Sequence, residues 1–148
     1  MSDMVINGSS DDAGDKPQHL KRVSRIKHVI LQKYLPAWAI ILGSRHQRLA
    51  YFDCFAGPGQ YEWEGRVVAG SPIIAVESAI AYLRQHPTQN LTMCLIEDDQ
   101  NQVAELHRSL TALGQRPKNL TLNLHCTDSK SSSQTCLEKK RGFAPLSF

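Results

Sequence analysis

Residues 51–59, YFDCFAGPG, place an aspartate at the end of an apolar run and two glycines just beyond it. A nucleotide-binding turn that leads from a buried strand into a loop has this pattern. Gly57 and Gly59 can adopt positive φ, and they carry no Cβ that would separate the main chain from whatever lies against it. The stretch therefore predicts a loop that a ligand can approach closely.

A helix is expected before this stretch, over residues 20–42. Its apolar residues recur in steps of three and four, which is the spacing of one helical face. Pro36 interrupts the pattern, so the segment is either one kinked helix or two helices that meet near Leu35. The expected buried face consists of Val23, Ile26, Ile30, Tyr34, Trp38 and Ile41.

Strands and helices alternate through the rest of the pattern. Residues 49–55, 91–96 and 120–126 predict strands, the first of them buried on both faces of a parallel sheet. Ser71 is expected to cap a helix that starts at Pro72 and stops before Pro87, and Asp99 to cap a helix over residues 100–113 that ends at Gly114. A weak signal predicts a small hairpin around Gly65. This order predicts an α/β, Rossmann-like parallel sheet of about three strands with flanking helices, preceded by an N-terminal helical segment.

Composition sets the domain organisation. A chain of 148 residues, 41% of them apolar and with a net charge of +3, can form one domain with a real core. Residues 1–18 are expected to be a flexible acidic N-terminus and residues 19–128 the folded domain. Residues 129–148 lack apolar periodicity and are expected to be a polar, disordered tail.

The sequence also disfavours several classes of function. No signal peptide or membrane-spanning run is recognisable, and the four cysteines, at 54, 94, 126 and 136, show no zinc or redox spacing. We therefore expect a cytoplasmic protein with buried reduced thiols, and no metal site among the scattered histidines. Residues 16–48 contain eight Lys or Arg residues and no acid. They fit either a nucleic-acid contact or a solvated basic helix face.

The candidate site lies where the expected strands end. Asp53 with Gly57 and Gly59, then Glu97, then Asp128 follow three successive strands, and the carboxyl ends of parallel strands meet at one rim of a sheet. A carboxylate after the second strand can accept hydrogen bonds from ribose hydroxyls, so the set suits an adenosine-type ligand. Tyr61 and Trp63 can stack on a base or cover the sheet edge. The Ser71 hydroxyl is expected to cap its helix and not to act as a nucleophile.

Three motifs together carry a family resemblance. Residues 27–35, KHVILQKYL, with Trp38, residues 52–61, FDCFAGPGQY, and residues 70–72, GSP, resemble the three-Cys-motif partner proteins, a prokaryotic family encoded beside proteins with a three-cysteine motif. The resemblance runs from about His19 to Asp128 and implies an S-adenosylmethionine-dependent methyltransferase-like protein. By this resemblance, Asp53, Gly57 and Gly59 line the methionine part of the cofactor, Glu97 holds the ribose and Asp128 lies near the adenine. Phe55, in the same loop, is also expected to bind the cofactor.

The resemblance also implies what this chain lacks. The family continues into a fourth strand that ends in an Asp-Pro-type motif and pairs with the outer side of the first strand, and residues 142–146, GFAPL, do not match it. We therefore expect an open edge on the first strand, where half of the cofactor crevice would be missing. A truncated gene or a shifted reading frame would account for this, and a naturally short protein is the alternative.

Two functions follow from these expectations. The first is an S-adenosylmethionine-binding, methyltransferase-like domain that is doubtful as an independent catalyst. The alternative is a non-catalytic partner of a neighbouring three-Cys-motif protein. An NAD site fits less well, because about ten residues separate the glycine loop from the next helix, whereas a dinucleotide fingerprint opens directly into its helix.

Overall fold

The structure, a computed structural model, describes residues 17–127. Most of the expected N-terminal segment, the expected tail and Asp128 lie outside the described residues. In order along the chain, the elements are α1 (Arg22–Gly43), β1 (Arg48–Asp53), β2 (Gln60–Trp63), β3 (Arg66–Ala69), α2 (Ser71–Gln85), β4 (Asn90–Glu97), α3 (Gln100–Ala112) and β5 (Leu120–Cys126).

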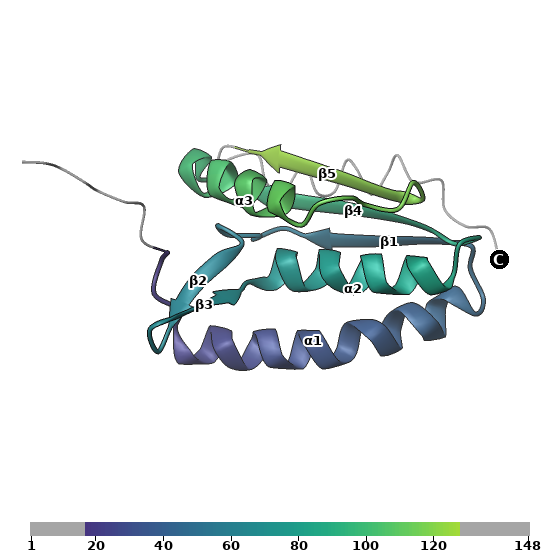
Figure 1. The fold of residues 1–148 in the computed structure, drawn as a ribbon, viewed down its shortest axis with the longest axis horizontal. Coiled ribbons are helices and arrows are strands. Elements are labelled where there is room, and N and C mark those ends of the chain that lie inside the picture. The colour runs from purple at the N-terminus through teal and green to yellow at the C-terminus, as the bar shows by residue number, and fades with distance from the viewer. Residues whose placement is uncertain (1–16, 128–148) are drawn as a thin grey trace, which may run out of the picture.

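The main sheet has three parallel strands in the order β1-β4-β5. The chain crosses from β1 to β4 through α2 and from β4 to β5 through α3, as the alternating pattern predicts. Among the described strands β1 pairs with β4 alone, so its other side is an edge. The described residues thus form an α/β fold with the arrangement of an incomplete Rossmann-like sheet (Figure 1).

All three helices contribute to the core on one face of this sheet. Alternate strand residues share a hydrophobic cluster with α1, α2 and α3, and because successive strand side chains point to opposite faces, these strand residues lie on the same face. In Figure 1, α1 runs beside α2, and α3 lies over β4 and β5. The strand residues of the cluster are Leu49, Tyr51, Leu91, Met93, Leu95, Leu120, Leu122 and Leu124.

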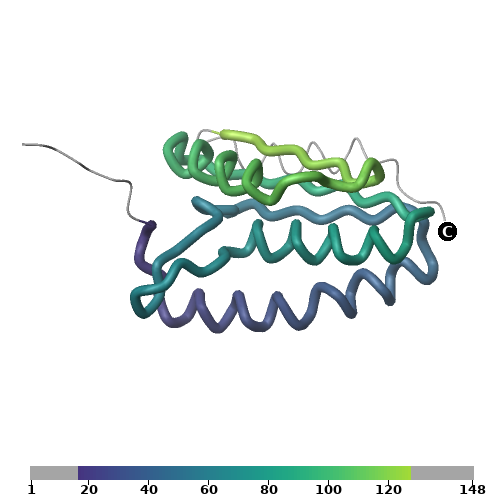
Figure 2. Tube along the Cα trace, viewed as in Figure 1, coloured from purple at the N-terminus to yellow at the C-terminus, as the bar shows by residue number. Residues whose placement is uncertain are grey.

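Helix α1 is a single helix that continues through Pro36. Figure 2 shows it as one continuous helix that curves along its length. Proline removes the hydrogen bond to the carbonyl four residues earlier, that of Gln32. Both residues are exposed, so water can solvate that carbonyl.

The predicted buried face of α1 is wrong. Five of its six residues are exposed, and only Trp38 is half-buried, edge-on to Tyr51 of β1. The helix instead buries His28, Leu35 and Ala39. The reason is steric: Ala39 faces Ala75 and Ala79 of α2, and small side chains let the two helices approach closely.

Two further expectations are corrected. Strand β1 is not buried on both faces, because it is an edge strand: Leu49 is buried, and its other residues are half-buried or exposed. The thiols are not all buried either. Cys94 is buried in β4, whereas Cys54 is half-buried and Cys126, at the end of β5, is exposed.

Local signals predicted the remaining elements well. Asp99 caps α3, its side chain accepting hydrogen bonds from the amides of Asn101 and Gln102, and Gly114 follows the helix with φ of 76°. The weak hairpin signal is confirmed as β2 and β3, whose turn residues Glu64 and Gly65 both have positive φ. None of the helices between residues 17 and 127 is long and apolar enough to cross a membrane.

Paired alanine substitutions test which face of α1 is buried. Leu35→Ala should lower the free energy of unfolding by about 2–5 kcal/mol, because Leu35 lies in the core between α1 and α2. Ile30→Ala should change it by less than about 0.5 kcal/mol, because that side chain is exposed. Urea unfolding followed by circular dichroism measures both. A loss at Ile30 as large as the loss at Leu35 would contradict the packing.

Candidate functional site

The candidate site lies at the carboxyl ends of β1 and β4. In Figure 1 the arrowheads of β1 and β5 point to the same end of the molecule, where the β2–β3 hairpin and the first turns of α1 also lie. The parallel register places Asp53, the last residue of β1, beside Leu95 of β4. Two residues farther along β4 comes Glu97, so the predicted convergence of these two strand ends is observed.

Asp53 fixes the start of the glycine loop. One carboxylate oxygen accepts a hydrogen bond from the Phe55 amide at 3.2 Å, and the other accepts one from the Ser71 hydroxyl at 2.7 Å. The expectation that Ser71 caps α2 is therefore wrong: Gly70 is the N-cap residue, and Ser71 is the first residue of the helix. These two hydrogen bonds hold β1, the loop and α2 together.

Glu97 is a buried carboxylate at the centre of the site, with only 7% of its surface exposed. Its Oε2 atom accepts a hydrogen bond from the Gly57 amide at 2.7 Å. Its Oε1 atom accepts from the amides of Asp98 at 3.0 Å and Asp99 at 3.1 Å. Hydrogen bonds to a charged acceptor are stronger than neutral ones, so these amides offset the cost of burying the carboxylate. Glu97 thereby ties the end of β4 to the loop after β1.

The two loop glycines are required by the protein's own packing. Gly57 and Gly59 have φ of 68° and 86°, a region that favours glycine. A Cβ on Gly57 would collide with the Tyr61 hydroxyl. A Cβ on Gly59 would lie 2.8 Å from Leu106 of α3. What lies against the loop on these sides is therefore a side chain of the same chain.

The rings of Tyr61 and His28 pack against each other beside the glycine loop. The His28 ring on α1 lies 5.7 Å from the Tyr61 ring on β2, and only 8% of His28 is exposed. Its Nδ1 atom is buried without a hydrogen-bond partner. Burial lowers the pKa of His28, as does Arg25, while Asp53 opposes this. Burial, with Glu97 and Asp53, raises the pKa of Tyr61.

Sequence reasoning missed His28, although it stands in the motif that carries the family resemblance. Its position on the helix was the available signal, since it lies seven residues before Leu35 and so on the same face. His28 was missed because a different face of the helix was predicted to be buried. A buried histidine that shares a face with core residues marks where α1 approaches the loop.

The other predicted residues fall outside this cluster. Trp63 stacks on His19 with ring centroids 6.3 Å apart, and His19 also contacts the Glu62 carboxylate at 3.1 Å. Phe55 is in the loop but points outward, with 87% of its surface exposed. Asp128 lies outside the described residues, so two of the three predicted acids are brought to the rim.

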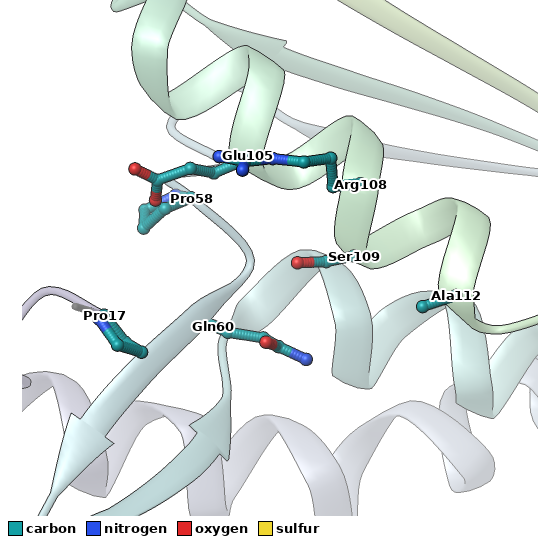
Figure 3. A pocket seen from close by; sticks show the side chains of 7 residues that line it. All are labelled: Pro17, Pro58, Gln60, Glu105, Arg108, Ser109 and Ala112. Atoms are coloured by element: carbon teal, nitrogen blue, oxygen red, sulfur yellow. The ribbon is translucent and has the colours of Figure 1, made fainter. Parts of the chain in front are cut away.

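A hollow of about 300 Å³ borders the loop on the side of α3. Figure 3 shows the side chains of Gln60 and Ser109 pointing into it. It does not include Asp53, Gly57 or Glu97, so it is separate from the candidate site. Its lining consists of Pro17, Pro58, Gln60, Glu105, Arg108, Ser109 and Ala112. Within residues 17–127, no three His, Cys, Asp or Glu side chains come together closely enough to hold a metal ion.

A double-mutant cycle tests the packing of Tyr61 on Gly57. Gly57→Ala should cost about 1–2 kcal/mol for its positive φ, plus the collision with the Tyr61 hydroxyl. Tyr61→Phe removes that hydroxyl and should recover part of the loss, giving a coupling of about 1 kcal/mol or more. Denaturant unfolding of the four proteins supplies the cycle. Equal costs of Gly57→Ala in both backgrounds would show that the hydroxyl lies elsewhere.

A pH series tests the burial of His28. Since the folded-state pKa lies below the unfolded value, the unfolded chain binds the proton first as pH falls. The stabilisation is present above the unfolded pKa of about 6.5 and is lost as pH falls below it. The free energy of unfolding should therefore drop more between pH 7.5 and pH 5 in the wild type than in His28→Gln, by up to about 1.4 kcal/mol per pH unit. Parallel pH dependences would contradict a buried, neutral His28.

No family model matches the chain, and no curated protein matches it. The functional argument therefore rests on the residues at the strand ends and on the contacts that hold them.

Proposed function

We propose that this rim binds the adenosine part of S-adenosylmethionine, and that the protein is methyltransferase-like, of the three-Cys-motif partner type. The observation that carries the proposal is the contact between Glu97 and Gly57. It joins an acid at the end of β4 to a glycine loop at the end of β1, with Oε2 2.7 Å from the amide. An acid and a glycine loop at neighbouring parallel strand ends are the pair that a nucleoside ligand needs.

Each residue has a distinct role in this proposal. The Oε2 atom of Glu97 accepts one hydrogen bond from a protein amide, and a carboxylate oxygen can accept a second, here from a ribose hydroxyl. Gly57 and Gly59 position the loop beside the methionine part, and the exposed Phe55 ring covers the ligand from outside. Asp53 and Ser71 hold the loop. The family resemblance assigns the adenine to Asp128, which lies outside the described residues. When bound, S-adenosylmethionine supplies an electrophilic methyl group.

Contacts within the protein restrict how the ligand can approach the loop. The Tyr61 hydroxyl fills the space over Gly57, and Glu97 already holds the Gly57 amide. The ligand therefore approaches from the Phe55 side of the loop or displaces Tyr61. The buried free thiol of Cys94 suits a reducing compartment, so we place this activity in the cytoplasm.

A second candidate function is a non-catalytic interaction protein, for example a partner of a neighbouring three-Cys-motif protein. The edge of β1 favours it. Among the described strands none pairs with the outer side of β1, so the crevice beside the glycine loop is bordered by only one of its two strands. Such a domain can retain a cofactor site and still act by binding a partner protein.

Calorimetric titration distinguishes these functions. S-adenosylmethionine and S-adenosylhomocysteine should both bind the wild type, because they share the adenosine part. Glu97→Gln should weaken both by at least about tenfold, which corresponds to about 1.4 kcal/mol for a lost charge-assisted hydrogen bond. Glu64→Gln is the matched control: the same change at an exposed hairpin turn should leave the affinity unaltered.

Circular dichroism establishes that each variant is folded before its titration is compared. Absence of binding by the folded wild type at about 1 mM ligand would reject the cofactor site and leave the interaction function. Tighter binding of NAD than of S-adenosylmethionine would also contradict the proposal.

A further inference from the structure

Helix α1 carries an apolar surface that the described part of the chain leaves uncovered. We name it the α1 stripe. Its six residues are each between 55% and 66% exposed, whereas α1 packs on α2 and β1 through a different face. Contiguous apolar surface of this kind marks an interaction site in a folded protein. The α1 stripe consists of Val23, Ile26, Ile30, Tyr34, Ile40 and Ile41.

The spacing of the α1 stripe suits a helical partner. If Val23 is taken as heptad position a, then Ile30 and Ala37 are also a positions, and Ile26 and Ile40 are d positions. Tyr34 and Ile41 occupy e positions and widen the stripe. β-Branched residues at a are favoured when one helix packs against another. The pattern covers almost the whole helix, so the partner segment needs about five turns.

A groove adjoins the α1 stripe at Ile40. It has a volume of about 370 Å³ and lies between α1 and α2, where Pro36, Ile74 and Tyr82 contribute to its lining. The lining also includes polar residues, Gln32, Glu77 and Gln85 among them. A groove beside a ridge of aliphatic residues can receive a side chain of a second helix.

Charge defines the kind of helix that fits. Helix α1 contains Arg22, Arg25, Lys27 and Lys33 and no acidic residue. Lys33 occupies the central d position between Ile26 and Ile40, and Lys27 occupies an e position. A second copy of α1 would bring only positive charges to the interface, and like charges juxtaposed there are costly. An acidic helix would pair with these side chains.

We propose that the α1 stripe binds an amphipathic, acidic helix of a partner protein. The apolar face of the partner packs on the α1 stripe, one of its side chains enters the groove beside Ile40, and its Glu or Asp residues meet Lys27 and Lys33. This interaction is separate from the cofactor site at Glu97 and does not depend on it.

The test uses two synthetic peptides of four heptads with Ile and Leu at a and d. One has Glu and the other Lys at every e and g position, so like-charge repulsion keeps each peptide from pairing with itself. Fluorescence anisotropy with the full-length protein should show binding of the Glu peptide at least about tenfold tighter than the Lys peptide. The double variant Lys27→Glu, Lys33→Glu should reverse this preference.

Two controls make the assignment specific. Ile30→Asn should abolish binding of the Glu peptide, whereas Arg116→Glu with Lys118→Glu, a charge change of the same size at exposed positions outside α1, should retain the preference for it. Failure of both peptides to bind, or equal binding of both, would overturn the proposal. Self-association of the free protein would also overturn it if Ile30→Asn removed that association. Binding to anionic vesicles or to RNA would overturn it if Ile30→Asn removed that binding.

Discussion

The buried Glu97 carboxylate is the interaction on which the candidate site depends. It accepts hydrogen bonds from the amides of Gly57, Asp98 and Asp99. Together with the hydrogen bond that the Ala56 amide donates to the Ile96 carbonyl at 3.0 Å, it ties the end of β4 to the loop after β1. A buried charge without such partners would be strongly destabilising. The loop conformation, the positive φ of Gly57 and the position of Tyr61 over it therefore form one unit with Glu97.

The sequence was sufficient for the sheet and for most element boundaries. Short apolar runs separated by helical periodicity predicted three strands of a parallel sheet, and Asp99 and Gly114 bounded α3 because capping depends on neighbours in the chain. The packed face of α1 was not predictable in this way, since the helix has two apolar faces. The choice between them depends on Ala75 and Ala79 of α2, which a local pattern does not include.

Local sequence patterns were also insufficient for the roles of residues at the candidate site. The pattern correctly predicted that Asp53 and Glu97 lie at the same rim of the sheet, because parallel strands end there. It assigned the Ser71 hydroxyl to a cap, where its oxygen would accept a hydrogen bond from a backbone amide. Gly70 is the N-cap residue instead, and the Ser71 hydroxyl donates to the Asp53 carboxylate at 2.7 Å. The glycines were interpreted as room for a ligand, whereas Tyr61 and Leu106 occupy the space beside them. In each case a contact between distant segments decided the role of the residue.

Hydrogen exchange of the Gly57 amide tests the central claim most directly. If the Glu97 carboxylate holds this amide in a buried site, its exchange followed by NMR should be slowed strongly relative to an unstructured peptide, and Glu97→Ala should remove that protection while the amides of β4 stay protected. Exchange of the Gly57 amide at the rate of an unstructured peptide in the wild type would contradict the account.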